Sequence, residues 1–457
     1  MQLYKHNGFL GAQMTEMQQH KKIFVKTYGC SRNYSDSETM AHYLLEAGYE
    51  ITGIGASDLS EEELISDADL VIVNTCTVKN PTEDKFFSFL KKLSNLNKIV
   101  VVAGCISQSE KGALWMKNYS VIGLDVLDNI VEIVDKTLAG EIVHNLARKQ
   151  GPWERPFLPT LRHKKVIVSI PILSGCLGNC TYCKTKFARG HLRSATSESI
   201  IEQIKTAVEK GIKEIWLVSE DNGAYGIDIG TTLPELLKLI ENIPGDFFVR
   251  IGMLNPDFAY KYRNELAEIM QSPRFFTFLH IPIQAADDNV LENMKRPYAI
   301  EEFEEAVSVL KEKNPNMTLA TDIICGYPSE TEEQWNVTMN FLKNFKFNAI
   351  NISKFYPRRG TVAAKMKLIP TQEVKRRSKE LSDWFETQNY NEDYVGKTLS
   401  VFVDEKGKKE GSFIGRLQNY KQVIVMSDID LIGQRVLVKV ESTTRDDLRG
   451  SIITQQE

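Results

Sequence analysis

The sequence lacks the long apolar runs of a membrane protein. No run in the 457 residues approaches the roughly 18 residues that a membrane-spanning helix needs. Residues 1–22 also lack the apolar core of a signal peptide. We therefore predict no membrane segment, a cytoplasmic location, and a separate N-terminal extension over residues 1–22.

The sequence also lacks a large excess of one charge, and its cysteine count does not suit disulfides. The 56 basic and 60 acidic residues leave a net charge of −4, which gives no global argument for a nucleic-acid partner. The seven cysteines are an odd number, and six of them form two sets of three. This pattern favours metal binding in a reducing compartment. A chain of this length exceeds one compact core, so several domains are expected.

The first set of cysteines lies in one short loop. Cys176, Cys180 and Cys183 follow the apolar run 166–170, and no fourth cysteine comes soon after. Three thiolates can hold three irons of a cubane cluster and leave the fourth iron open for chemistry. A ferredoxin cluster needs four cysteines, so it is disfavoured. A zinc site that recruits His191 stays open on the motif alone.

The second set is spread along the chain. Cys30, Cys76 and Cys105 each follow a predicted strand, at 23–28, 70–73 and 99–103. Because the carboxyl ends of parallel strands meet at one edge of a sheet, these cysteines can converge. They predict a second cluster with an open iron; three buried core cysteines are the alternative.

The alternation of strands and helices predicts an α/β protein of three domains. Residues 23–140 form a parallel-sheet domain with helices at 35–47, 82–93, 108–117 and 126–138. The polar, proline-containing stretch 141–164 is a predicted linker.

The remaining two domains differ in pattern. Residues 165–390 hold six predicted strands, which indicates a partial (β/α)6 barrel. One of its helices covers 197–209, with Ser197 as cap, and another covers 301–313. Residues 391–457 carry short β segments that predict a small antiparallel β-barrel. The strands of the partial barrel are expected at 166–170, 214–218, 247–251, 276–281, 318–324 and 349–354, and those of the small barrel at 399–403, 412–416, 422–425 and 435–440.

Polar residues follow the predicted barrel strands, where active sites of such folds lie. The candidates are Glu220, Gln284, Asp322 and Gly326. For each one alone, a loop hydrogen bond or helix cap is the simpler explanation. His280 and Cys325 are predicted to belong to the core.

A basic stretch covers residues 354–379, with nine Lys and Arg against one acid. Phosphate binding explains it, and so does a solvated helix face. The candidate nucleic-acid contacts there are Arg358, Arg359, Lys375, Arg376 and Arg377. In the last domain the candidates are Phe413, Arg416, Tyr420 and Lys421, for which a structural role is the alternative.

The cysteine loop 176–183 resembles the signature of radical S-adenosylmethionine (SAM) enzymes. Together with the 28–33 and 74–78 stretches, it resembles the methylthiotransferase family. That resemblance implies two [4Fe–4S] clusters and SAM, with the N-terminal cluster carrying the sulfur that is inserted into the substrate. It places Tyr182 and the Gly326 segment beside adenine, Arg193 in an R-G-x-x-R-S pattern, and Glu220 near the SAM ammonium group. The run Ala285-Ala286-Asp287 departs from the family's Ser-Gly-Ser.

The same resemblance suggests a substrate and partners. The runs 219–226 and 250–256 look like the archaeal and eukaryotic branch, which acts on N6-threonylcarbamoyladenosine at position 37 of tRNA. The implied partners are tRNA, an external electron donor and a sulfur source, and the last domain resembles the RNA-binding TRAM domain. Isopentenyladenosine in tRNA and a ribosomal-protein aspartate are alternative substrates. A non-catalytic iron–sulfur protein that binds RNA or senses redox state is the alternative of another class.

Overall fold

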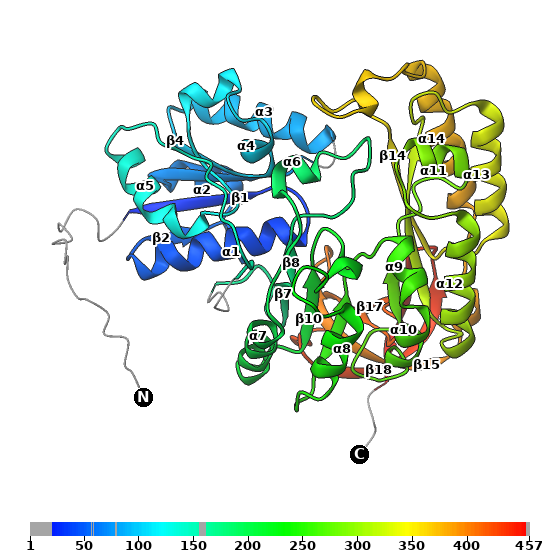
Figure 1. The fold of residues 1–457 in the computed structure, drawn as a ribbon. Coiled ribbons are helices and arrows are strands. Elements are labelled where there is room, and N and C mark those ends of the chain that lie inside the picture. The colour runs from blue at the N-terminus through cyan, green and yellow to red at the C-terminus, as the bar shows by residue number, and fades with distance from the viewer. Residues whose placement is uncertain (1–20, 56, 58, 78–79, 155–160, 454–457) are drawn as a thin grey trace.

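The computed structural model describes residues 21–453 except 56, 58, 78–79 and 155–160. The predicted extension 1–22 therefore lies almost wholly outside the described residues. An N-terminal α/β domain lies beside a central α/β domain, and a small barrel closes the described chain (Figure 1). None of the helices in the described part is long and apolar enough to cross a membrane.

The N-terminal domain is built on one parallel sheet in the order β2-β1-β3-β4-β5-β6. The three strands predicted from sequence are confirmed, while the other three are too short to give a sequence signal. Strand β6 comes from the stretch that was predicted to be a linker. The strands are β1 (Lys22–Thr27), β2 (Glu50–Thr52), β3 (Leu70–Thr75), β4 (Ile99–Gly104), β5 (Ser120–Ile122) and β6 (His144–Asn145).

Helices cover both faces of this sheet. Helices α1 (Ser31–Glu46) and α5 (Ile130–Leu138) bury their apolar side chains on one face. Helices α2 (Glu61–Asp67) and α3 (Asn80–Asn95) do so on the other. The single helix predicted over 108–117 is wrong, because Gly112 adopts a φ of 78° that no α-helix contains. That region instead forms α4 (Cys105–Ser109) and the 3-10 helix η1 (Leu114–Asn118).

The central domain has the six predicted strands. They form two parallel sheets, β7-β10-β11 and β12-β13-β14, which a bridge between Val249 and Phe275 connects. This arrangement is a partial barrel, as predicted. The strands are β7 (Ile167–Pro171), β10 (Glu214–Val218), β11 (Phe248–Ile251), β12 (Phe278–His280), β13 (Thr318–Cys325) and β14 (Ala349–Lys354), and the hairpin β8 (Leu173–Ser174) and β9 (Arg193–Ser194) follows β7.

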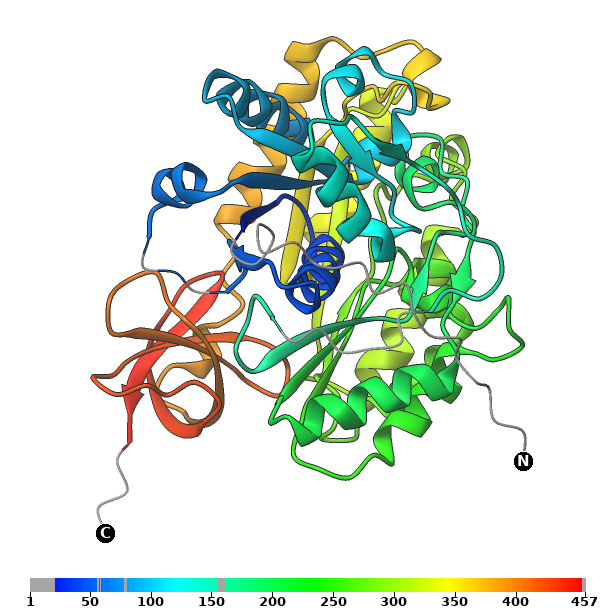
Figure 2. The ribbon, with the colours of Figure 1, turned by 90° about the vertical axis from the view of Figure 1, so that its left-hand side faces the viewer.

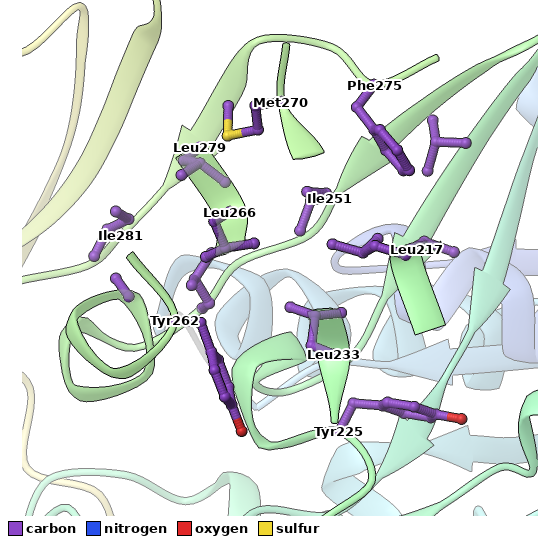
Figure 3. Close-up of a cluster of buried hydrophobic side chains, with 14 of the residues drawn as sticks. Leu217, Tyr225, Leu233, Ile251, Tyr262, Leu266, Met270, Phe275, Leu279 and Ile281 are labelled. Atoms are coloured by element: carbon purple, nitrogen blue, oxygen red, sulfur yellow. The ribbon is translucent and has the colours of Figure 1, made fainter. Parts of the chain in front are cut away.

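Helices surround the outside of the partial barrel and bury a large apolar core against it (Figure 3). Leu217 and Ile251 of the strands pack with Leu233 and Leu266 of the helices. The cap of α7 is Thr196, which accepts a hydrogen bond from the Ser199 amide, so the predicted cap is one residue off. The helices are α6 (Thr185–Arg189), α7 (Ser197–Glu209), α8 (Leu233–Glu241), α9 (Pro256–Lys261), α10 (Arg263–Ile269), α11 (Asp288–Asn293), α12 (Ile300–Lys313), α13 (Glu332–Asn344) and α14 (Thr371–Glu386).

The C-terminal domain is a closed five-stranded barrel in the order β15-β16-β17-β19-β18. Four of its neighbouring pairs are antiparallel and β17 pairs with β19 in parallel, so the antiparallel prediction holds for four pairs of five. The strand β19 was not predicted. The strands are β15 (Thr398–Lys406), β16 (Ser412–Arg416), β17 (Gln422–Met426), β18 (Arg435–Thr443) and β19 (Asp447–Ile452).

This small barrel packs against the N-terminal ends of the central strands. Phe402 and Tyr420 contact Phe248, Phe276 and Phe278, which lie at the beginnings of β11 and β12. Figure 2 shows the barrel, in orange and red, as a lobe beside the central domain. The opposite, carboxyl-terminal ends of the strands carry the cysteine loop.

Candidate active site

The first cysteine triplet lies in the loop between β8 and α6. A Cβ atom built on Gly178 would lie 3.5 Å from the Cys176 Sγ and 3.7 Å from the Cys180 Sγ, so both thiols flank this glycine. The Lys186 ammonium donates to the carbonyl oxygens of Leu177 at 3.1 Å and Gly178 at 3.3 Å. Hydrogen bonds therefore fix the shape of the loop, with the sulfurs of Cys176 and Cys180 beside Gly178.

Donor groups surround the sulfurs of this loop. The Thr185 amide donates to the Cys183 Sγ at 3.4 Å, and the Arg296 guanidinium lies 3.8 Å from the Cys180 Sγ. Burial raises the pKa of Cys176 to about 12 and raises the pKa of Cys183. These thiols therefore keep their protons in the metal-free chain, and metal binding must release them.

The second triplet meets at the carboxyl edge of the N-terminal sheet. Cys30 precedes α1, Cys76 follows β3, and Cys105 begins α4. The Asn33 side chain connects two of them, because it accepts from the Cys30 Sγ at 3.4 Å and its amide lies 3.9 Å from the Cys105 Sγ. A Cβ on Gly29 would lie 2.6 Å from the Cys76 Cβ, so the third cysteine is adjacent.

Each triplet offers three thiols, the donor set of an iron–sulfur cluster with an open iron. Among the described residues, no three His, Cys, Asp or Glu side chains are close enough to hold one metal ion. In a cubane cluster each thiolate binds its own iron, so the three sulfurs can stand farther apart. The donor set of three thiols at each place matches a cluster with one open iron.

The two triplets lie at the same domain interface. Cys105 packs with Leu124 and with Ala188, and Ala188 belongs to α6, which begins directly after the Cys183 loop. Helix α4, which Cys105 begins, packs against α6 over its length. The segment after one triplet is thus in contact with a member of the other.

A buried network of charged groups connects the loops of the two triplets. Arg189 of α6 pairs with Asp36 of α1 at 2.7 Å and with Glu220 at 3.2 Å, and all three side chains are almost fully buried. Glu220 also accepts from the amide of Gly175 at 3.0 Å, next to Cys176. Arg32, two residues after Cys30, pairs with Asp36 at 3.4 Å.

Three further ion pairs hold the two domains together. Lys184 binds Glu110 at 2.7 Å, Arg193 binds Asp125, and Arg358 binds Glu83 at 2.9 Å. Two of these basic residues, together with Arg189, come from the ten residues after Cys183. The chain that follows the first triplet is therefore the main polar contact to the domain that carries the second.

The predicted cofactor residues divide into two groups. Tyr182 packs in the apolar cluster of Tyr298, Ile324 and Tyr327 beside the cysteine loop. Gln284 adopts a φ of 68° and forms a backbone bridge to Ile323. These two stay predictions with geometry that suits a ligand above the strands.

The remaining cofactor candidates have protein partners. Asp322 accepts from Asn351 at 2.7 Å and bonds the His280 ring at 2.8 Å. Glu220 is bound by Arg189, and Arg193 by Asp125 and the Lys149 carbonyl. A Cβ on Gly326 would lie 2.5 Å from Val374, so this glycine makes room for α14. His280 is half-buried and bonded to Asp322, whereas Cys325 is buried as predicted.

Three of the predicted RNA contacts are paired with acidic residues of the protein. Arg377 is buried against Glu330 at 2.8 Å, and Arg358 is buried against Glu83. Arg416 pairs with Asp404 at 3.1 Å and stacks on Tyr420 at the domain interface. The predictions for Arg358 and Arg377 are wrong, because a buried, paired guanidinium has no surface to offer a phosphate. Arg416, whose side chain is 14% exposed, stays a prediction.

The other basic candidates are exposed. Arg359 and Lys375 lie at the surface, while the exposed Arg376 pairs with Glu332, Glu373 and Glu380. In the small barrel, Phe413 belongs to the core, and burial lowers the pKa of Lys421 to about 8 as its ammonium donates to Asn391. Tyr420 is part of the domain interface.

Sequence reasoning missed the residues that hold the triplets in place. Arg296 also donates to the Asn255 side chain at 2.8 Å, and Asn255 donates to the buried Asp221 at 2.6 Å. Burial raises the pKa of Asp221 to about 7. Asp36 gave no signal, since it lies within an ordinary amphipathic helix.

Comparison with known families assigns three parts of the chain. Residues 22–123 match the "Uncharacterized protein family UPF0004", residues 170–342 match the Radical SAM superfamily, and residues 392–453 match the TRAM domain. The small C-terminal barrel is thus a TRAM domain, in agreement with the resemblance seen in the sequence.

Curated relatives match nearly the whole chain. A human threonylcarbamoyladenosine tRNA methylthiotransferase is 41% identical over 440 residues, which cover 95% of this chain and 74% of the relative. A protein of Pyrococcus abyssi, named a probable threonylcarbamoyladenosine tRNA methylthiotransferase, is 38% identical. The match covers 95% of this chain and 100% of that relative.

Solved structures share the fold. TsrM from Kitasatospora setae, a radical S-adenosylmethionine methyltransferase, aligns with a TM-score of 0.52 at 14% identity, over 73% of this chain and 73% of its own. A second structure of that enzyme, with cobalamin and a [4Fe–4S] cluster bound, gives a TM-score of 0.53 at 13% identity over 73% of this chain and 72% of its own.

Proposed function

Because the chain belongs to the threonylcarbamoyladenosine tRNA methylthiotransferase family, we propose that it converts N6-threonylcarbamoyladenosine at position 37 of tRNA to the 2-methylthio derivative. The radical SAM family implies SAM and one [4Fe–4S] cluster for the central domain. The second cluster and the tRNA substrate are part of the proposal.

The observation that carries the proposal is the position of the two cysteine triplets. Cys105 contacts α6, which follows Cys183 directly, and Arg189 of that helix is paired with Asp36 and Glu220. A reaction that needs a radical at one centre and sulfur at another requires both within reach of one substrate atom. The contact between Cys105 and α6 supports such an arrangement.

The chain's own residues would bind and orient the reacting groups. Cys176, Cys180 and Cys183 would hold the cluster that, with SAM, supplies a 5′-deoxyadenosyl radical, and Cys30, Cys76 and Cys105 would hold the cluster that carries the sulfur. The Arg296 guanidinium and the Thr185 amide stabilise negative charge on the first set of thiolates.

Residues above the strands would hold SAM itself. Tyr182 offers an aromatic ring beside the cysteine loop for adenine, and Gln284 presents its amide from a turn at the end of β12. Asp322 lies at the same ends of the strands, where its Oδ1 atom is bound by His280 and Asn351. The buried apolar cluster around Tyr182 would keep water from that side of the place where a radical would form.

The partners follow from the reaction. The cluster of the central domain would need an external electron donor, the inserted sulfur would need a sulfur source, and tRNA would be modified in the cytoplasm. Arg359, Lys375 and Arg376 are the exposed members of the predicted RNA contacts, and Arg376 is paired with acids.

An anaerobic assay tests the proposal. The reconstituted protein is incubated with dithionite, SAM and tRNA that carries N6-threonylcarbamoyladenosine without the methylthio group. Mass spectrometry of the digested tRNA should show the methylthio derivative, and Cys180→Ala should give none. Modification of isopentenyladenosine or of a ribosomal-protein aspartate in the same assay would contradict the substrate. Absence of 5′-deoxyadenosine would favour a non-catalytic iron–sulfur protein.

A further inference from the structure

Large apolar side chains are exposed around the cysteine loop of the central domain. Leu177 is 43% exposed, Phe187 48%, Tyr356 50% and Val362 55%. Leu177 lies in the cysteine loop, Phe187 in α6, and the other two in the loop that follows β14. We call these four residues the apolar rim.

Contacts connect the three segments that carry the apolar rim. Lys186, the neighbour of Phe187, donates to the Leu177 carbonyl. A Cβ on Gly360 would lie 3.7 Å from the Phe187 ring, so the loop after β14 touches α6. The Ala363 amide, next to Val362, donates to the carbonyl of Thr181 in the cysteine loop at 2.9 Å.

The aromatic members are held in place by their neighbours. The Phe187 carbonyl accepts from Arg148 at 2.9 Å, and the adjacent Ala188 is buried. Tyr356 lies 5.9 Å from the guanidinium of Arg358, which Glu83 holds. These rings are therefore presented to solvent by a fixed backbone. Exposed apolar groups gathered at the mouth of a site mark an interaction surface.

Positive charge accompanies these rings. Arg359 lies between Tyr356 and Gly360 and is exposed, and Lys354, Lys365 and Lys367 are exposed on the same segment. Fixed aromatic faces beside cations suit unpaired nucleotides, whose bases stack while their phosphates bind the cations. A duplex would offer no free base face to the rings.

We propose that Phe187 and Tyr356 stack on unpaired nucleotides that flank the reacting nucleoside, and that Arg359 binds a phosphate of the same RNA loop. This inference rests on the proposed function and adds the residues that select single-stranded RNA. The rim adjoins the Cys176 loop, so a stacked neighbour would hold the reacting nucleoside over the candidate active site.

Binding of a fluorescent anticodon stem–loop RNA to the full-length, cluster-loaded protein tests the proposal. Phe187→Ala and Tyr356→Ala should each weaken binding about 5- to 150-fold, as loss of one base–aromatic stack does. Phe187→Trp should restore binding and Phe187→Leu should not, because stacking needs an aromatic face and not apolar area. Arg359→Ala should reduce the dependence of binding on salt by about one phosphate contact.

The control is Leu239→Ala, which removes an equally exposed apolar side chain from α8. Iron content and 5′-deoxyadenosine formed without RNA should match the wild type in every variant. Unchanged RNA binding in both aromatic variants would overturn the inference. Variants that bind RNA normally but whose cluster is reduced more slowly by an electron-donor protein would overturn it too, because the apolar rim would then bind that protein. If the wild type binds the RNA but does not modify it, the proposed function is contradicted, whereas the result on base stacking still holds.

Discussion

The two cysteine triplets differ in how the chain brings them together. Cys176, Cys180 and Cys183 lie within one loop, whose shape is fixed by hydrogen bonds from Lys186. Cys30, Cys76 and Cys105 come from three strand ends, so only the folded sheet unites them. The first triplet depends on local backbone and the second on the packing of a whole domain, and this difference determines how each can be broken.

The largest expected effects come from replacing one cysteine of each triplet. Cys180→Ala should reduce both 5′-deoxyadenosine and methylthiolated product to background, because the radical can no longer form. Cys76→Ala should keep 5′-deoxyadenosine formation and lose the product, because only the sulfur-carrying centre is affected. Liquid chromatography with mass spectrometry measures both compounds in one sample. Equal loss of 5′-deoxyadenosine in the two variants would contradict the division of roles.

A backbone change should break the second triplet without touching a thiol. Gly104 has a φ of 93°, and a Cβ there would lie 2.4 Å from the Asn74 side chain and the Thr75 carbonyl. Gly104→Ala should therefore displace Cys105 and lower the iron content by about half. Gly112→Ala is the matched control, since its φ is 78° and no atom lies within 4 Å of its Cβ. The control variant should lose only about 1–2 kcal/mol of stability and keep its iron. If Gly112→Ala also lost iron, the steric explanation for Gly104→Ala would be contradicted.

The buried network between the triplets gives an intermediate effect. Asp36→Asn removes one charge from the pair with Arg189, which should destabilise the protein by about 3–5 kcal/mol. If the variant retains both clusters, the product formed per 5′-deoxyadenosine should fall by up to about 100-fold, because small displacements of reacting centres are costly. The ratio of the two compounds measures this directly. A normal ratio in a destabilised variant would reduce Asp36 to a purely structural role.

The smallest effect is expected at the far end of the partial barrel, where the TRAM domain packs. Burial next to Asp404 raises the pKa of Glu214 from 4.5 to about 7, while Trp216 and Tyr420 donate to its Oε1 atom. The charged groups facing it are Asp404, Arg416 and Arg250, with Lys164 and Glu405 beyond. Because the folded state holds this proton more tightly, the stabilising contribution is complete below about pH 4.5 and is lost as the pH rises through about 7.

Glu214→Gln should abolish that contribution. Between pH 5 and pH 8 the wild type should lose about 1–3 kcal/mol more unfolding free energy than the variant. Urea unfolding at the two pH values measures the difference, and both clusters should be unaffected. A wild type that becomes more stable relative to the variant as the pH rises would reverse the sign and contradict the argument.

Local patterns in the sequence were sufficient for much of the fold. The spacing of Cys176, Cys180 and Cys183 and the apolar strands of the partial barrel depend on neighbouring residues, and both were predicted. The short strands β2, β5 and β6 were missed, because two or three residues carry no periodicity and pair only when the sheet exists. The break at Gly112 was missed because a helical pattern continues on both sides of it.

Charge was the least reliable guide to the site. Arg358, Arg377 and Arg416 look like phosphate contacts in the sequence, yet each is paired with acids from distant parts of the chain. The partners Glu83, Glu330 and Asp404 cannot be assigned before the fold is known. For the same reason the pairing of Arg189 with Asp36, which connects the two triplets, had no counterpart in the sequence.

The most direct test is the iron that remains when the first triplet is removed. With Cys176, Cys180 and Cys183 all replaced by Ala, anaerobic reconstitution should leave about four irons and four sulfides per chain. Electron paramagnetic resonance of the reduced protein should show one [4Fe–4S] cluster, held by Cys30, Cys76 and Cys105. A variant without iron, or with zinc in its place, would contradict the account.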